Sequence, residues 1–286
     1  MNNKVYILLP VHNRKNITLK FIDLLKSQKY SKFCILLIDD GSTDGTTQEV
    51  CIKFPETVVI KGKGNWWWGG SLHQGFRYLK KQNISTDDIV LIINDDSEIS
   101  SDFISLGVIE INSNKNSLIL ATAFDSETKM QTEGGVFYNL KTNTITEVHE
   151  NHLINCMTTR GLFINAQDFI NLKGFHPLLL PHYRSDYEFT IRAWKRGYKL
   201  ICSDKIKLWF DDKTTGIHKL NFKSLKWSQF FKQYFSKSYV DNPIYAINFY
   251  LLLFPFPYNF KHVYIELKKM MKVFFVVFKS NISGRK

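Results

Sequence analysis

The sequence predicts an α/β protein, with a mostly parallel, doubly wound sheet that helices flank and a smaller helical appendage after it. Apolar runs of strand length alternate with segments of helical apolar spacing through residues 4–210. The last quarter of the chain is instead basic and aromatic. We therefore divide the chain into a catalytic domain, residues 1–212, and a C-terminal appendage, residues 213–286.

The first half of this domain repeats a strand-then-helix unit. Strand patterns at 4–9, 34–38, 57–60 and 89–93 are each followed by a predicted helix. The helix after the first strand places Ile17, Phe21, Ile22 and Leu25 on one face. Further along, we expect strands at 118–122 and 158–164, a hairpin within 131–148, a short helix at 166–172 and a helix ending near Gly197.

Composition limits the class of protein. With 286 residues, 44% hydrophobic and 22% charged, the chain has material for one large core. Its four cysteines are widely spaced and form no C-x-x-C pair, which indicates reduced thiols in a cytosolic protein. The N-terminus enters a strand pattern directly and lacks the pattern of a signal peptide.

Acidic residues follow the strands. The run 89–93 is apolar throughout, which is typical of a strand buried on both faces, and it ends in Asn94, Asp95 and Asp96. Ligands of open α/β sheets bind beyond the carboxyl ends of the strands, where paired carboxylates suit Mg2+ or Mn2+ and phosphate. The alternative is an ordinary turn, since this motif is also good turn and capping chemistry. No G-x-G-x-x-G or Walker motif is present, so a phosphate must be held by metal and side chains.

Four motifs together carry a resemblance to a known family. They are PVHNR at 10–14, DDGSTDGT at 39–46, NDD at 94–96, and GF at 174–175 followed by SD at 185–186. In this order they resemble the inverting family 2 glycosyltransferases of the GT-A fold over about residues 4–210. The resemblance implies a nucleotide-sugar donor, a divalent metal and a hydroxyl acceptor.

The resemblance also implies roles for individual residues. Pro10 and Asp40 match positions that hold the nucleotide base. Asp96 matches the last position of the family's metal motif, and Asp95 is a candidate contact to ribose or a metal-bound water. Asp186 matches the general base, although Ser185 stands where the family commonly has Glu. A simple helix cap is the alternative for Asp186.

Two further candidates lie outside these four motifs: the tryptophan segment, which the residues themselves suggest, and His218, which the resemblance implies because similar enzymes often have a histidine after the last strand of the sheet. Consecutive side chains diverge on any regular element, so the three tryptophans at 66–68 cannot all enter one core. We expect Trp67 at the ligand cleft, with Asn65 as a donor contact, or else tryptophans that cover the sheet edge. His218 is a candidate third ligand to metal or diphosphate, and a solvated surface histidine is the alternative.

The appendage predicts membrane association. Residues 213–286 carry 13 of the 38 Lys and Arg but only Asp241 and Glu266 as acids. Aromatic residues occur there with long aliphatic runs, which favours an anionic lipid surface over nucleic acid. These runs are shorter than the roughly 20 residues that span a bilayer. We expect a cytoplasmic protein peripheral to the inner face of the membrane; packing onto the catalytic domain or an oligomer contact is the alternative.

Together with the basic appendage, the resemblance implies a metal-dependent hexosyltransferase that builds bacterial-type surface polysaccharide on a glycan or lipid-linked acceptor. Two other classes remain open. A sugar-nucleotide nucleotidyltransferase uses a similar sheet but has a glycine-rich basic loop after its first strand. A non-catalytic sugar-nucleotide binding module would not need Asp96 and Asp186.

Overall fold

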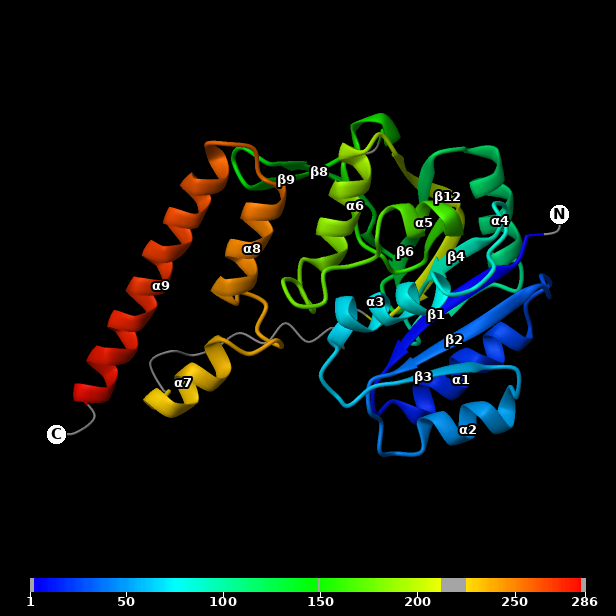
Figure 1. Ribbon diagram of the computed structural model, residues 1–286, viewed down its shortest axis with the longest axis horizontal. Helices are drawn as coiled ribbons and strands as arrows, with labels where there is room; N and C mark the ends of the chain where they lie inside the picture. Colours follow the sequence, from blue (N-terminus) through cyan, green and yellow to red (C-terminus); the bar gives the residue numbers. More distant parts are fainter. Residues whose placement is uncertain (1–2, 149, 212–224, 284–286) are drawn as a thin grey trace.

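The computed structural model describes residues 3–148, 150–211 and 225–283. A nine-stranded mixed sheet forms its centre, in the order β3-β2-β1-β4-β11-β6-β12-β5, with β7 paired to β6 (Figure 1). The principal strands are β1 (Val5–Val11), β2 (Phe33–Asp39), β3 (Val58–Lys61), β4 (Ile89–Ile92), β6 (Ser117–Asp125), β11 (Leu162–Asn165) and β12 (Lys199–Phe210). Strands β1 to β4 are mutually parallel, whereas β11 runs antiparallel between β4 and β6.

Both faces of this sheet are buried, as the apolar strand patterns predict. Along β1, Val5, Ile7 and Leu9 enter one core, and Tyr6 and Leu8 enter the other, because successive side chains of a strand alternate. Helices α1 (Lys15–Lys26), α2 (Thr46–Lys53) and α4 (Phe103–Ser113) cover the first face. Helices α3 (Trp67–Leu79), α5 (Ala166–Asn171) and α6 (Ser185–Lys195) cover the second.

The segment expected as a hairpin divides at Gly134. Strand β7 (Gln131–Glu133) pairs with β6, while β8 (Gly135–Asn139) pairs with β9 (Thr144–Glu147) and with β10 (Cys156–Met157) in a second, antiparallel sheet. Two short elements complete this part of the fold, β5 (Glu98–Ile99) and the 3-10 helix η1 (Asn151–Leu153). The four cysteines form no disulfide.

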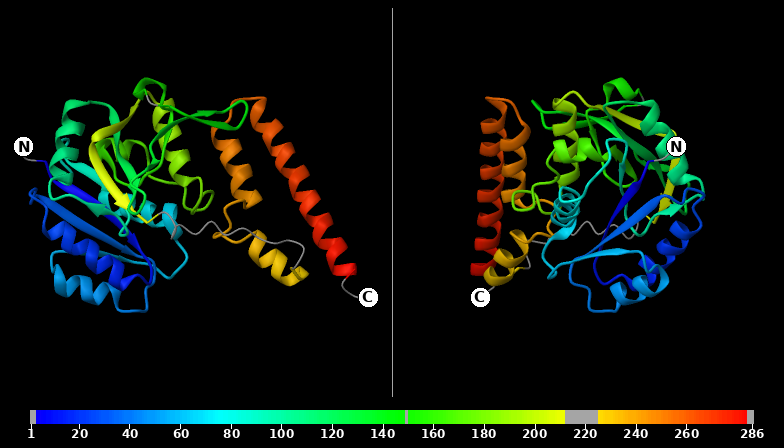
Figure 2. Two further views of the ribbon diagram at one scale, coloured as in Figure 1. Left: turned by 180° about the vertical axis from the view of Figure 1, so that it is seen from behind. Right: turned by 45° about the vertical axis from the view of Figure 1, so that its right-hand side comes forward.

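Three helices of the appendage are described: α7 (Trp227–Tyr234), α8 (Pro243–Leu253) and α9 (Tyr258–Ser283). Helix α8 lies between α9 and α6 in both views of Figure 2. Phe249 and Ala246 of α8 share a core cluster with Ile191 of α6 and Tyr138 of β8. The appendage therefore packs on the catalytic domain through α8, while α9 forms the outer layer.

Candidate functional site

The carboxyl ends of β1, β2 and β4 surround a cavity of about 370 Å³. Five of its lining residues come from different parts of the chain: Pro10, Asp40, Trp67, Asp95 and His182. Such a cleft beyond the carboxyl ends of parallel strands is where open α/β sheets bind ligands. The first four of these residues are candidates that the sequence places in one nucleotide-sugar site.

Asp40 organises the loop on one side of this cavity. Its carboxylate accepts four backbone N–H groups, from Gly64 (2.9 Å), Asn65 (3.0 Å), Trp66 (2.7 Å) and Trp67 (3.0 Å). A carboxylate offers about four lone-pair sites, so these bonds use its whole acceptor capacity. Asp40 thus holds the start of α3 in place, and its contact with a nucleotide base remains a prediction.

The three tryptophans diverge, as expected. Trp67 has a left-handed φ of 60° and lines the cavity, with its ring 5.1 Å from that of His182. Trp68 also lines it and donates from Nε1 to Oγ1 of Thr159 at 3.1 Å. Trp66 packs against the core of the second sheet face. Asn65 accepts hydrogen bonds at its O and Oδ1 from Nζ of Lys237, each at 2.8 Å.

The two acids after β4 differ in environment. Asp95 is buried and accepts from Oγ1 of Thr18 at 2.7 Å, with Nη1 of Arg14 at 3.3 Å from its Oδ1. Burial raises the pKa of Asp95, and Arg14 offsets this effect only in part. Asp96 is more accessible. Burial raises its pKa too, but Arg160 and Arg14 outweigh that effect and hold the pKa below its ordinary value.

Arg160 connects Asp96 with Glu133 of β7. Its Nη1 lies 2.5 Å from Oδ1 of Asp96, and its Nε lies 3.5 Å from Oε1 of Glu133. The guanidinium carbon is 3.9 Å from the centroid of the Phe210 ring, which fixes the plane of the group. Glu133 also accepts from Oγ1 of Thr158 at 2.8 Å. A cation thus joins two carboxylates from β7 and the tip of β4.

Asp186 lies in the first turn of α6 and near Glu133. Arg184, not Asp186, occupies the N-cap position, so the alternative of a simple cap does not hold. Burial and the Glu133 carboxylate raise the pKa of Asp186 to about 6, although the backbone N–H of Tyr187 lowers it. A carboxylate with this pKa is ionised at neutral pH yet remains a useful proton acceptor.

The loop before α6 is held against the start of α3. A Cβ on Gly69 would lie 2.7 Å from Cβ of Ser185 and 2.8 Å from the carbonyl oxygen of Leu180, so only glycine fits there. The backbone N–H of Gly70 donates to the carbonyl of Pro181 at 3.1 Å. His182 from this loop lines the cavity, and burial lowers its pKa to about 4, which keeps its imidazole neutral.

The acids fit a metal only as part of a shared site. Within residues 3–148, 150–211 and 225–283, no three His, Cys, Asp or Glu side chains are grouped to hold a metal ion. His218 falls outside the described residues. The anionic Asp96 offers carboxylate oxygens, and Mg2+ is typically bound by one or two carboxylates plus substrate phosphates and waters. The residues present therefore fit a divalent ion that a bound diphosphate also holds.

Several site residues were missed from the sequence. Arg14 stands in a recognised motif, but no role follows from that motif alone. Arg160 and Glu133 lie in segments without a catalytic signature, and only the pairing of β11 and β7 with β6 brings them together. Lys237 is one of many appendage lysines. A long-range contact of this kind leaves no signal in a single sequence.

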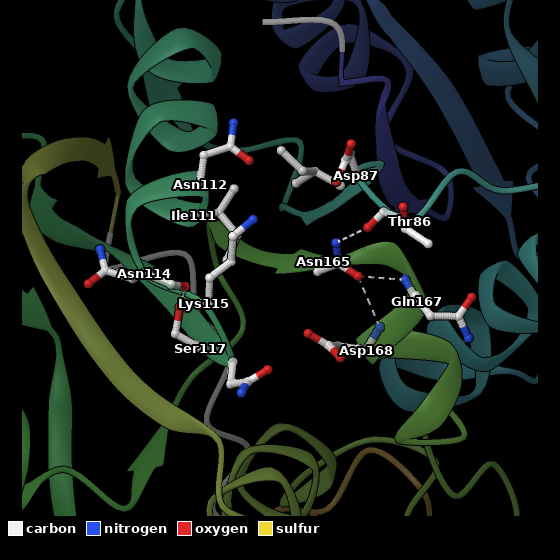
Figure 3. Close-up of a pocket in the computed structure, with 12 residues that line it drawn as sticks. Thr86, Asp87, Ile111, Asn112, Asn114, Lys115, Ser117, Asn165, Gln167 and Asp168 are labelled. Atoms are coloured by element: carbon white, nitrogen blue, oxygen red, sulfur yellow. Dashed lines mark hydrogen bonds between the residues drawn. The ribbon is translucent and has the colours of Figure 1, made fainter.

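A second cavity, of about 250 Å³, lies near the amino end of β4 (Figure 3). Thr86 and Asp87 precede β4 there, and Asn165 ends the antiparallel β11. Asn165 donates to the carbonyl of Thr86 at 2.6 Å and accepts from the backbone of Gln167 at 2.9 Å. These amides hold loops together at the amino ends of the parallel strands, and none of the candidate residues that the structure describes lies there.

Comparison with known proteins agrees with this architecture. The family model for glycosyl transferase family 2 matches residues 6–166. An uncharacterized glycosyltransferase of Rickettsia bellii is 22% identical over 176 residues, which are 60% of this chain and 24% of that protein. One from Rickettsia felis is 32% identical over 89 residues, which are 30% of this chain and 15% of that protein. The chain thus spans about a quarter or less of the length of these relatives.

Solved structures share the fold at low sequence identity. S. aureus TarS 1–349, in complex with UDP-GlcNAc, superposes with a TM-score of 0.61 at 14% identity, covering 87% of this chain and 66% of that one. GalNAc-T7 with UDP, GalNAc and Mn2+ gives a TM-score of 0.61 at 12% identity, covering 89% and 52%. The mannosyltransferase PcManGT of Pyrobaculum calidifontis, with GDP-Man and Mn2+, gives 0.57 at 14%, covering 76% and 59%.

The curled sheet, its covering helices and the acidic cleft define a GT-A fold. The chain belongs to glycosyl transferase family 2.

Proposed function

We propose that this protein is an inverting glycosyltransferase that moves a hexose from a nucleotide-diphosphate donor to a hydroxyl of a glycan or lipid-linked glycan. The observation that supports it best is a series of electrostatic contacts: Arg160 forms ion pairs with both Asp96 and Glu133, and Glu133 acts on the carboxyl group of Asp186. A leaving-group site and a base site then lie on two sides of one cleft. Assembly of a bacterial-type surface polysaccharide is the role that suits such an acceptor.

The donor occupies the cavity at the ends of β1, β2 and β4. The base lies against Pro10 and the loop that Asp40 orders, Asp95 contacts the ribose or a metal-bound water, and Asn65 and Trp67 contact the donor. A flat aromatic ring such as Trp67 suits either a base or the apolar face of a sugar. The two guanidinium groups of Arg14 and Arg160 face the position of the diphosphate, where they offset its charge.

Asp96 would hold the divalent ion, Mn2+ or Mg2+, jointly with the diphosphate oxygens. When bound, such an ion neutralises the negative charge that develops on the leaving nucleotide. The Mn2+ in the complexes of GalNAc-T7 and PcManGT supports this assignment. In the free protein Arg14 and Arg160 pair with Asp96. When the donor binds, the divalent ion would replace these guanidinium groups at the Asp96 carboxylate.

Asp186 takes the proton from the acceptor hydroxyl. The acceptor oxygen then attacks the anomeric carbon from the side opposite the nucleotide, the bond to the diphosphate breaks, and the configuration at that carbon inverts. His182, neutral because it is buried, does not compete for that proton at neutral pH. Glu133 keeps the pKa of Asp186 high enough for efficient proton transfer.

Membrane association through α9 belongs to the same proposal. Among the described residues no helix is both long and apolar enough to cross a bilayer. Exposed apolar side chains nevertheless recur every three or four residues along α9: Phe260, Tyr264, Leu267, Met271, Phe275, Phe278 and Ile282. The exposed Lys261, Lys268, Lys272 and Lys279 each directly follow a residue of this apolar stripe. These features support a helix that lies in the interface of an anionic membrane, with the protein peripheral to its inner face as part of the proposal.

The first experiment is hydrolysis of a panel of nucleotide sugars, with and without Mn2+, followed by mass spectrometry of candidate lipid-linked acceptors. Asp186→Asn should abolish transfer while donor binding is kept, and Asp96→Ala should remove the metal-dependent part of donor affinity. Transfer by Asp186→Asn at the wild-type rate would exclude Asp186 as the base. If the protein instead converts a nucleotide sugar and added pyrophosphate into a sugar 1-phosphate and a nucleoside triphosphate, it is a nucleotidyltransferase.

The membrane proposal needs the full chain, because α8 is part of the core beside α6. Leu267→Gln and Met271→Gln should reduce co-sedimentation with vesicles that contain phosphatidylglycerol. Ile52→Gln is the control, because it changes an apolar residue on α2 that is at least as exposed as Leu267 and Met271. Equal vesicle binding by all variants would contradict a lipid role for α9, and a concentration-dependent change in mass would favour an oligomer contact instead.

A further inference from the structure

A separate cavity of about 390 Å³ lies between the start of α6 and the appendage. Three cationic side chains line it, Arg184 before α6 and Lys269 and Lys272 from α9. Tyr234 and Tyr239 add aromatic rings with hydroxyl groups. None of these residues lines the donor cavity, so the two cavities are separate.

The charges in this cavity leave cations for a ligand. Two acids also line it, Asp241 and Glu266. Glu266 is buried and lies 3.4 Å from Nζ of Lys269, so this pair is satisfied within the protein. Over the described ranges of the chain, Arg184 and Lys272 take part in no ion pair. With Asp241 and Glu266 counted, the three cations of this cavity still exceed its two acids by one charge, which favours an anionic group such as a phosphate.

The position of Arg184 relates this cavity to the proposed base. Arg184 is the N-cap residue of α6, and Asp186 lies in the first turn of the same helix. The Arg184 guanidinium lies 5.7 Å from the ring of Phe249, which contacts Tyr138, and Tyr138 contacts Tyr187 beside Asp186. This buried aromatic cluster therefore packs between Arg184 and the residue beside the proposed base.

From this arrangement we propose that the cavity binds a phosphate group of the acceptor through Arg184 and Lys272. This inference rests on the proposed glycosyl transfer, since it takes Asp186 as the point where the acceptor hydroxyl reacts. It names a substrate class, an acceptor sugar that carries a phosphate, and assigns the appendage a share in binding it. The cationic cavity and the exposed apolar stripe belong to the same helix, α9, so a phosphate joined to a lipid can use both surfaces.

Two sources of that phosphate are distinguishable with the full-length protein. Isothermal titration calorimetry with inorganic pyrophosphate tests a free phosphate, and titration with water-soluble dihexanoyl phosphatidic acid tests a lipid-borne one. Lys272→Gln should weaken binding about fivefold or more, because it removes one cation from the phosphate. Lys268→Gln is the matched control, since Lys268 is an exposed lysine one turn away on α9 that does not line the cavity.

The comparison of the two variants decides the proposal. The proposal is supported if Lys272→Gln loses affinity for the phosphate compound while the affinity of Lys268→Gln stays within about twofold of wild type. Binding of the compound at the donor arginines does not affect this comparison, because both variants keep those arginines. Tighter binding of phosphatidic acid indicates a lipid-borne phosphate, and tighter binding of pyrophosphate a free one. Equal losses of affinity in both variants, or no binding of either compound by the wild type, would overturn the proposed phosphate site.

A second measurement keeps this inference separate from the proposed function. Donor hydrolysis by Lys272→Gln should equal that of the wild type, because Lys272 does not line the donor cavity. If the wild type hydrolyses no nucleotide sugar, glycosyl transfer fails while the phosphate result stands by itself. If donor hydrolysis is normal and the lysine variants do not differ, the phosphate site alone is refuted.

Discussion

Nη1 of Arg160 lies 2.5 Å from Oδ1 of Asp96, and the same guanidinium group lies 3.5 Å from Glu133. One buried cation thus holds an acid of the β4 tip and an acid of β7 at a fixed separation. Burial raises the pKa of Asp186 and Glu133 adds to that effect, so the charges of Asp96, Arg160 and Glu133 are linked to the proton affinity of Asp186.

Arg160→Gln should be strongly destabilising. The Arg160 side chain is only 8% exposed, and its removal leaves Asp96 and Glu133 without their shared cation. Losing one partner of a buried ion pair costs about 3 kcal/mol. Lys53→Gln is the control, because its partner Asp23 is 58% exposed and the loss of such a surface pair should cost at most about 1 kcal/mol. Urea denaturation measures both, and equal costs would contradict the bridging role of Arg160.

The raised pKa of Asp186 predicts an unusual pH dependence of stability. A carboxyl group whose pKa rises from 3.8 to about 6 on folding binds more protons in the folded state. The free energy of unfolding therefore falls as the pH rises from about 4 to about 6, by no more than about 3 kcal/mol for this group. Asp186→Asn is neutral throughout and should lack this loss. Parallel stability curves for the two proteins between pH 4 and pH 7 would refute the shifted pKa.

Much of the fold follows from local patterns, but the cleft does not. The strands β1 to β4 and helices α1, α3 and α4 were predicted because apolar alternation and helical spacing are local properties. Asp95 and Asp96 were found for the same reason, since they end a buried strand. The break at Gly134 was missed because it depends on β7 pairing with β6 instead of β9. That pairing brings Glu133 to Arg160, so the electrostatic partner of Asp186 was missed with it.

Asp40→Asn should disrupt the loop that begins α3. An asparagine keeps one oxygen for two of the four backbone N–H groups, and its own NH2 group faces the other two, which lose their acceptor. The cost should be about 2 kcal/mol in stability, with weaker nucleotide binding. Asp44→Asn is the control, because Asp44 accepts from the Lys15 and Thr46 backbone in an exposed turn. Similar effects of both changes on nucleotide affinity would mean that Asp40 has no special role in the donor loop.

The contact between Lys237 and Asn65 predicts a direct effect of the appendage on donor binding. Its Nζ donates to O and Oδ1 of Asn65 at 2.8 Å, and Asn65 follows Gly64, which lines the donor cavity. Lys237→Met keeps the apolar stem but removes both bonds, so the loop loses an anchor worth about 1 kcal/mol at an exposed site. We expect the KM for the donor to rise about fivefold while the melting temperature stays nearly unchanged. Lys232→Met on α7 is the control, because Lys232 is exposed and is not a partner of Asn65 in these bonds. If both variants keep the wild-type KM, the appendage does not act on the donor site through this contact.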